Sequence, residues 1–231
     1  MTRLGLVVPS SNTTVEPAFR AILSDEHTVH AARMPLEDVT TEDLDAMADG
    51  AERAASLLLH ASVDGVAYSC TTGSLIHGSG FDAQLESRLS DAADAPAVAT
   101  ALSVVRALNA CDVERVAVAT PYTAELDRLE HEYLTANGFE VITIDGRGLV
   151  ANDAIGALDA DDAEQHGRSV LSAAPEADAL FISCTNYRSL PALPSLEAAF
   201  DVPVISSNAA RSGICVIGSE STWTCPLDLV N

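Results

Sequence analysis

The sequence predicts an α/β fold made of two similar lobes, each built around a parallel β-sheet. Short β-branched runs alternate along the chain with longer Ala-rich stretches of helical periodicity, a pattern typical of repeated βα units. Related motifs also recur in the same order in the two halves of the 231 residues. We therefore expect two Rossmann-like lobes related by a pseudo-twofold axis, with the active site in the cleft between them.

Seven short apolar runs are the expected strands. They are rich in Val, Ile and Leu, and most end beside Gly, Pro, Ser or Thr, which favour turns. In chain order they are residues 4–8, 65–69, 98–100, 116–120, 141–144, 180–183 and 204–206.

Two stretches between these strands predict helices with recognisable ends. Residues 40–62 are expected to begin with Thr41 as N-cap and to have an apolar side formed by Ala46, Ala54, Leu57 and Leu58. Residues 124–137 are expected to form a second helix, because Asn137 and Gly138 are a typical helix stop.

The internal repeat consists of three matching pairs of segments. The clearest pair sets Asp-Gly-Val-Ala-Tyr-Ser-Cys-Thr-Thr against Asp-Ala-Leu-Phe-Ile-Ser-Cys-Thr-Asn. The pairs are residues 64–72 with 178–186, 6–10 with 118–122, and 95–98 with 202–205. They keep one order and nearly one spacing, which indicates duplicated halves. We place the N-terminal lobe at residues 1–107 together with 206–231, and the C-terminal lobe at residues 108–205.

The charge of the chain limits its partners. Against 34 acidic residues stand 12 basic ones, all of them Arg, so the formal net charge is −22. Such a surface repels phosphate backbones and anionic lipids, and we expect neither nucleic acid nor membrane as a partner. Acidic residues spread over a Lys-free chain resemble those of haloarchaeal proteins, so we expect a halophilic protein.

Several other classes of protein have little support in the sequence. The N-terminus leads directly into a strand without a signal peptide, and no apolar run approaches the roughly 20 residues of a spanning helix, so we expect a cytoplasmic location. The six His residues lack the spacing of metal ligands, and no Gly-rich dinucleotide motif follows a strand. We therefore expect neither metal nor cofactor, and a homodimer as the default assembly.

Cys70 and Cys184 are the candidate catalytic residues. Each follows an expected strand and precedes small hydroxyl residues at a turn, where backbone N–H groups lower the pKa of a thiol and bind carboxylates. Taken singly, either could be a buried cysteine that acts as a small hydrophobic residue. Their matched positions in duplicated halves favour catalysis, whereas no such echo exists for Cys111, Cys215 and Cys225.

At these motifs the sequence resembles the aspartate/glutamate racemase superfamily, and within it the maleate cis-trans isomerases and arylmalonate decarboxylases. The most specific segment is Pro-Ser-Ser-Asn-Thr-Thr-Val-Glu, which is most similar to the isomerase branch. The segments that carry the resemblance are residues 8–16, 70–74, 120–122 with 125–126, the region around Asn152, 183–186 and 206–208.

The resemblance implies a role for each candidate residue. Cys70 would be the nucleophile and Cys184 the partner acid or base. Amide and phenol groups bind carboxylates without adding charge, and Asn12, Tyr122 and Asn152 match the substrate-holding positions. Asn12 could instead cap a helix, Tyr122 pack at a strand end and Asn152 form a turn. We add as candidate substrate contacts Ser10, Ser11, Thr71, Thr72, Thr185 and Asn186.

Two features favour isomerisation within this superfamily. Both thiols are present, whereas by resemblance the decarboxylases keep only the second. Racemases typically have a proton-relaying His or Glu where this chain has Asn186, which cannot take a proton. We expect conversion of maleate, or a related cis-enedioate, to fumarate through a Cys70 thioether. The alternatives are a racemase or decarboxylase of another small dicarboxylate, and a non-catalytic dicarboxylate-binding protein.

The end of the chain departs from the family pattern. In relatives the Ser-Ser-Asn segment precedes a helix with an aromatic and apolar stripe, but residues 211–231 lack that stripe and hold only two acids, Glu220 and Asp228. A shifted reading frame or a truncation is our hypothesis for this difference.

Overall fold

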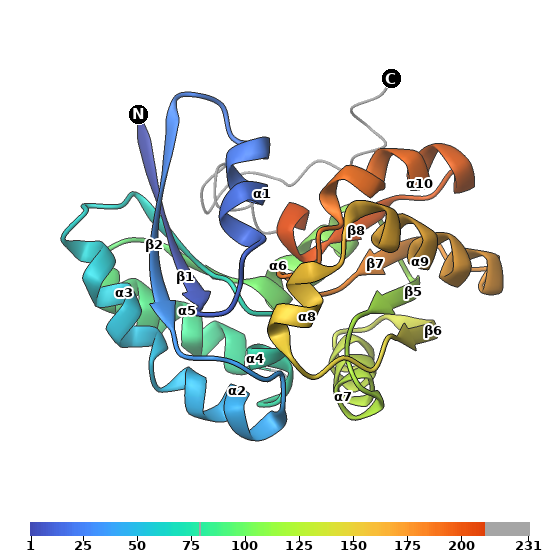
Figure 1. Ribbon diagram of the computed structural model, residues 1–231, viewed down its shortest axis with the longest axis horizontal. Helices are drawn as coiled ribbons and strands as arrows, with labels where there is room; N and C mark the ends of the chain where they lie inside the picture. The colour runs from blue at the N-terminus through green and yellow to red at the C-terminus, as the bar shows by residue number, and fades with distance from the viewer. Residues whose placement is uncertain (79, 211–231) are drawn as a thin grey trace.

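Two parallel four-stranded sheets form the framework of the protein (Figure 1). The structure, a computed structural model, describes residues 1–78 and 80–210. The first sheet has the order β2-β1-β3-β4, with β1 at Thr2–Pro9, β2 at His27–Met34, β3 at Gly65–Tyr68 and β4 at Ala97–Ala99. The second has the order β6-β5-β7-β8, with β5 at Arg115–Thr120, β6 at Glu140–Gly146, β7 at Ala179–Ile182 and β8 at Val204–Ser206.

The two sheets have the same strand order, and every pairing in them is parallel. The segments that echo each other in the sequence therefore occupy equivalent strands, β1 with β5, β3 with β7 and β4 with β8. This arrangement confirms the predicted α/β fold with two similar lobes and is consistent with a pseudo-twofold relationship between them.

The helices lie around and between these sheets. In Figure 1 the helices of the first lobe gather on the left and those of the second on the right. Their bounds are α1 Val15–Ile22, α2 Thr41–Ala48, α3 Ala51–Leu59, α4 Thr72–Leu75, α5 Phe81–Ala93, α6 Thr100–Ala110, α7 Ala124–Ala136, α8 Asn152–Ala157, α9 Ala160–Ala173, the short 3-10 helix Leu190–Ala192 and α10 Leu193–Phe200.

Strand β2 escaped the sequence prediction, although the other seven strands lie within two residues of their expected ends. It is an edge strand that pairs with β1 alone, and its first four residues are half-exposed. An edge strand need not be apolar throughout. The apolar pattern of β2 is interrupted by polar residues, namely His27, Thr28, His30 and Arg33.

The single helix expected over residues 40–62 is wrong. The segment forms two helices, α2 and α3, which are separated at Asp49 and Gly50. The Gly50 N–H donates to the Met47 carbonyl at 2.9 Å, which closes a turn where the helix ends. The N-cap is Thr40 rather than Thr41, because the Thr40 side chain accepts from the Asp43 N–H. The second expected helix is confirmed as α7, which ends at Asn137 and Gly138.

The hydrophobic core is continuous between the lobes. One cluster of buried side chains contains Tyr68 and Cys70 of the first lobe as well as Tyr122 and Cys184 of the second. Helix α6, which holds the predicted boundary at residues 107 and 108, packs against both β4 and β8. The boundary itself stays a prediction, and the hypothesis about residues 211–231 lies outside the described residues.

No helix within residues 1–78 and 80–210 is long and apolar enough to cross a membrane. No group of three or more His, Cys, Asp or Glu side chains in the same ranges is arranged to hold a metal ion.

Candidate active site

The Cys70 thiol lies in the tight turn between β3 and α4. The Gly73 N–H donates to its sulfur at 3.3 Å, and Thr72 Oγ1 lies 3.6 Å from the same atom. A Cβ at Gly73 would come within 2.4 Å of the Tyr68 hydroxyl and 3.4 Å of the Cys70 sulfur. A side chain at this position would therefore clash with the Tyr68 hydroxyl, so the turn favours glycine.

Cys184 occupies the equivalent turn after β7. Its backbone has a φ of 86°, a left-handed conformation that a non-glycine residue adopts at an energetic cost. The Asn186 N–H donates to its sulfur at 3.4 Å. Both thiols are buried, and each accepts a hydrogen bond from a backbone N–H of its own turn.

The two thiols line one small enclosed cavity between the lobes. Its other lining residues are Pro9, Asn12, Leu36, Val39, Thr71, Thr72, Tyr122, Asn152 and Thr185. The cavity volume is about 10 Å³, close to the space of a single water molecule, so a dicarboxylate enters only when the walls separate. A larger pocket of about 380 Å³ beside α1 contains neither thiol.

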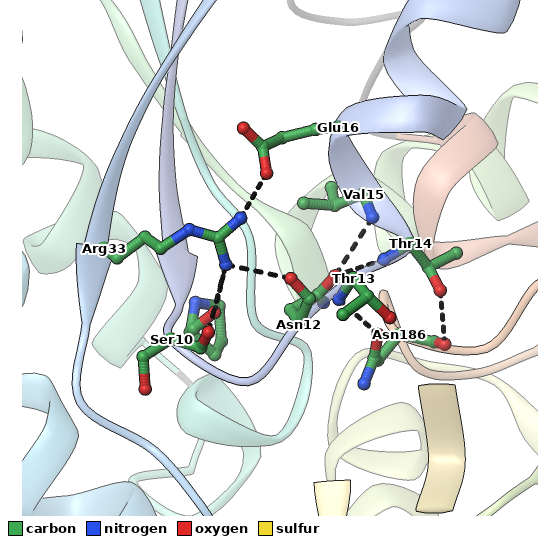
Figure 2. A network of polar contacts seen from close by, with 9 residues as sticks. Ser10, Asn12, Thr13, Thr14, Val15, Glu16, Arg33 and Asn186 are labelled. Carbon is green, nitrogen blue, oxygen red and sulfur yellow. Dashed lines mark hydrogen bonds and ion pairs between the residues drawn. The ribbon is translucent and has the colours of Figure 1, made fainter. Parts of the chain in front are cut away.

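Asn12 both caps a helix and faces the second lobe. Its Oδ1 accepts from the backbone N–H groups of Thr14 and Val15, each at 3.0 Å, at the start of α1 (Figure 2). Its Nδ2 donates to Thr185 Oγ1 at 3.0 Å. Asn12 therefore caps α1 and also lines the cavity, while its contact with substrate stays a prediction.

Arg33 fixes the loop that carries Asn12. From the end of β2 its guanidinium donates to the carbonyls of Pro9, Ser10 and Asn12 at 3.3, 3.1 and 2.9 Å, and it pairs with Glu16 (Figure 2). The sequence analysis missed Arg33. No local sequence pattern indicates that an arginine on one strand donates hydrogen bonds to the backbone carbonyls of a loop after the neighbouring strand.

Asn186 lies behind the cavity and joins the lobes. Its Oδ1 accepts from the Thr13 N–H at 3.0 Å, while its backbone carbonyl accepts from the Thr14 hydroxyl at 2.9 Å. Its Nδ2 donates to the backbone and side-chain oxygens of Asn152 at 2.7 and 3.1 Å. The amide is thus engaged by protein groups and stands outside the cavity lining.

Ser10 and Ser11 hold the loop that follows β2 instead of lining the cavity. The hydroxyl of Ser10 donates to the Leu36 carbonyl at 3.2 Å and accepts from the Leu36 N–H at 3.0 Å. Ser11 also donates to the Leu36 carbonyl and accepts from Asn152 Nδ2 at 2.8 Å. The serines therefore place the side chain of Leu36 in the cavity wall.

The threonines after each thiol reach into the opposite half of the site. Thr71 donates to Ser207 Oγ at 2.9 Å, and Thr185 donates to the Ser69 carbonyl at 2.9 Å. In each cysteine turn, the threonine after the thiol thus anchors the turn through its hydroxyl. The duplicated Ser-Cys-Thr motif therefore produces the same kind of anchoring hydrogen bond at both thiols.

Burial sets the charge state of Cys184 and Tyr122. Burial raises the pKa of the Cys184 thiol to about 12, although hydrogen bonds from Tyr122 and the Asn186 N–H oppose the shift. The pKa of the Tyr122 phenol is raised well above its usual range by burial, by Cys184 and by Glu130. The lowered thiol pKa expected from the turn is therefore wrong for Cys184, because a thiol with a pKa of about 12 is neutral at physiological pH.

Two buried carboxyl groups near the thiols were missed in the sequence. Glu130 on α7 accepts from Ser183 Oγ at 2.6 Å, and Asp82 on α5 accepts from the Tyr133 hydroxyl at 2.6 Å. Both are at most 2% exposed. The signal was present on α7, where Glu130 shares a buried face with Leu126, Tyr133 and Leu134.

Comparisons with known proteins agree with this geometry. A family profile described as arylmalonate decarboxylase matches residues 4–220. A maleate isomerase of Pseudomonas putida is 33% identical over 91% of this chain and 88% of its own length. A solved maleate isomerase structure from Pseudomonas putida has 29% identity and a TM-score of 0.87, and it covers 91% of this chain and 90% of its own.

A further solved structure bears on the chemistry. A cysteine-to-serine mutant of the Nocardia farcinica maleate cis-trans isomerase, with a covalently bound succinylcysteine intermediate, is 31% identical with a TM-score of 0.85. It covers 91% of this chain and 89% of its own. The resemblance drawn from the motifs is confirmed.

Proposed function

This chain belongs to the arylmalonate decarboxylase family, and we propose that it is an isomerase that converts maleate, or a related cis-enedioate, to fumarate without a cofactor. The observation that carries the proposal is the shared cavity, in which Cys70 and Cys184 lie together with Asn12, Tyr122 and Asn152. The Nocardia relative is described with a succinylcysteine, the adduct expected when a thiol adds to maleate.

The proposed reaction begins at Cys70. Its thiolate adds to one alkene carbon, and the π electrons move to the other carbon, where the Cys184 thiol delivers its proton. The product is a succinyl thioether whose central carbon–carbon bond is single and free to rotate. After rotation, the Cys184 thiolate removes a proton from the same carbon, the carbon–sulfur bond breaks, and fumarate leaves with Cys70 again a thiolate.

The neutral side chains of the cavity suit a dianionic substrate. Asn12, Tyr122 and Asn152 are hydrogen-bond donors that hold carboxylates, while Thr71, Thr72 and Thr185 add hydroxyls. In this proposal Ser10, Ser11 and Asn186 do not contact the substrate. They hold two residues of the cavity wall, Leu36 and Asn152, in place. Binding opens the cavity, because its present volume excludes the substrate.

Incubation with maleate tests the proposal directly. Proton NMR in concentrated salt is expected to show fumarate with the wild type and none with Cys70→Ala. The absence of product from the wild type, or equal turnover in the variant, would remove the assignment.

The family name supports decarboxylation as a second candidate. Loss of CO₂ from an arylmalonate would establish it, and deuterium exchange at an amino acid α-carbon would establish a racemase. Tight maleate binding without conversion or exchange would leave a dicarboxylate-binding protein. We favour isomerisation because both thiols line the cavity.

We further propose a cytoplasmic homodimer adapted to high salt. The Lys-free chain with a net charge of −22 supports the adaptation, since concentrated salt screens its self-repulsion. Light scattering tests the dimer, and turnover that rises with potassium chloride concentration tests the salt requirement.

A further inference from the structure

Glu130 is a buried acid that the proposed reaction does not use. It lies on α7, is 1% exposed, and accepts from Ser183 Oγ at 2.6 Å through Oε1. Its other oxygen, Oε2, is buried without a hydrogen-bond partner in the described ranges. A buried carboxylate requires hydrogen-bond donors or a positive partner at both oxygens, and here one oxygen has none among the described residues. The environment therefore favours the uncharged carboxyl group.

Ser183 connects this carboxyl to the reacting groups. It directly precedes Cys184, and its hydroxyl also interacts with the Tyr122 phenol. That phenol hydrogen-bonds to the Cys184 sulfur. A continuous polar chain therefore leads from Glu130 through Ser183 and Tyr122 to the proton-donating thiol.

The surroundings of Glu130 favour its uncharged form. Burial raises the pKa of the carboxyl to about 8, and the nearby Asp127 adds to the rise, while the hydrogen bond from Ser183 opposes it. Asp127 in turn faces Asp145 of β6, and Tyr122 faces Glu130 from the loop before α7. All of these neighbours are acidic or neutral, so each of them disfavours a negative charge at Glu130 or leaves it uncompensated.

The first lobe has a related but different arrangement. Asp82 acts electrostatically on Tyr68, which neighbours Cys70, much as Glu130 acts on Tyr122. Asp82, however, accepts from Tyr133 of α7 and also interacts with Ser74, which lies in α4 after the Cys70 turn. Glu130 differs because it bonds Ser183, the residue directly before Cys184, the thiol that in the proposed reaction both gives and takes a proton.

We propose that Glu130 is a positioning residue for Cys184, which in its uncharged form holds Ser183 and Tyr122 against the thiol and when ionised opposes formation of the Cys184 thiolate. The inference rests on the proposed function, because it assigns a role within the same site. We therefore expect turnover to fall at alkaline pH as Glu130 ionises.

Variants at position 130 separate charge from shape. Glu130→Gln keeps an acceptor for Ser183 and cannot ionise, so its alkaline limb of kcat moves up by about one pH unit or more. Glu130→Leu leaves Ser183 without its acceptor and lowers kcat by about 10²-fold at neutral pH. Glu132→Gln, an exposed position on the same helix, is the control and keeps the wild-type profile.

Two readouts independent of turnover complete the test. Difference infrared spectroscopy is expected to show a buried carboxylic acid band that disappears at high pH and is missing from Glu130→Gln. In a Cys70→Ser background, methyl methanethiosulfonate is expected to modify Cys184 severalfold faster above about pH 9 when Glu130→Gln is added, because a nearby anion disfavours the thiolate.

The outcomes distinguish the two hypotheses. Identical pH profiles and identical Cys184 modification rates in wild type and Glu130→Gln would overturn the role of Glu130. The proposed function would be refuted if the wild type does not convert maleate. The coupling of Glu130 to Cys184 would still stand if the wild type shows the acid band and Glu130→Gln makes Cys184 modification faster.

Discussion

The side-chain amide of Asn186 donates to both the backbone carbonyl and the side-chain oxygen of Asn152, at 2.7 and 3.1 Å. Both residues are buried, and they belong to different segments of the second lobe. Since Asn152 Nδ2 also donates to Ser11, this contact fixes a cavity-lining amide against the first lobe. Asn186 therefore supports the cavity through its contacts with Asn152 and Thr13.

Asn186→Ala is expected to weaken both folding and binding. It removes the acceptor of the Thr13 N–H and the donor to the Asn152 side-chain oxygen, at a cost of about 1–3 kcal/mol in the free energy of unfolding. A misplaced Asn152 also raises KM. Chemical denaturation and steady-state kinetics measure the two effects, with Asn137→Ala, which loses a local helix-end bond, as control. Equal stability of the two variants would contradict the bridging role.

Cys184→Ser is expected to accumulate the covalent intermediate. The serine hydroxyl is a poorer acid and base than the thiol, so the Cys70 thioether forms slowly and decays more slowly still. Intact-protein mass spectrometry after exposure to maleate is expected to show one added maleate. The double variant with Cys70→Ala should carry no adduct, and an adduct there would place the nucleophile elsewhere.

The strands and the thiols could be predicted from sequence because their signals are local. Seven strands are apolar runs, and the Ser-Cys-Thr motif occurs twice at equivalent strand ends. Strand β2 was missed because an edge position relaxes the need for apolar residues. The break at Gly50 was missed because its neighbours continue a helical pattern.

The supporting residues could not be predicted in the same way. Arg33 and Glu130 act on loops that are distant in sequence, Arg33 on residues 9–12 and Glu130 on Ser183. Charged residues on an edge strand or a helix are usually solvated, so sequence alone favours the ordinary interpretation. The apolar positions of α7 indicate which face of the helix is buried, but only tertiary packing shows that the Glu130 carboxyl on that face bonds Ser183.

Gly73→Ala is expected to disturb the Cys70 turn through a specific clash. The new methyl group would lie 2.4 Å from the Tyr68 hydroxyl, and relieving this overlap costs about 1–3 kcal/mol. The Tyr68 hydroxyl is buried without a hydrogen-bond partner in the described ranges. Tyr68→Phe therefore removes the clashing atom at little cost in stability. Thermal unfolding and kcat of the single and double variants measure the effect. A double variant no better than Gly73→Ala alone would show that the clash is not with Tyr68.

Glu130→Gln is expected to change how stability depends on pH. Burial raises the pKa of Glu130 to about 8 in the folded protein, whereas the unfolded chain releases this proton near its ordinary value of about 4.3. Between these values the folded state binds more protons, so the contribution of Glu130 falls as pH rises, by up to about 1.4 kcal/mol per unit.

The wild type should therefore lose stability relative to Glu130→Gln from about pH 5 to pH 8, with the full contribution of Glu130 restored only below its unfolded pKa. Chemical denaturation at several pH values in constant high salt measures the free energy of unfolding of both proteins. Groups that titrate in both proteins cancel in the difference between them. Glu132→Gln provides the control. Glu132 pairs with Arg128 on the surface of α7, so its side chain is exposed to solvent in the folded as in the unfolded protein. Curves for wild type and Glu130→Gln that stay parallel across this window would mean that Glu130 is already ionised in the folded protein, and the uncharged carboxyl behind Ser183 would have to be abandoned.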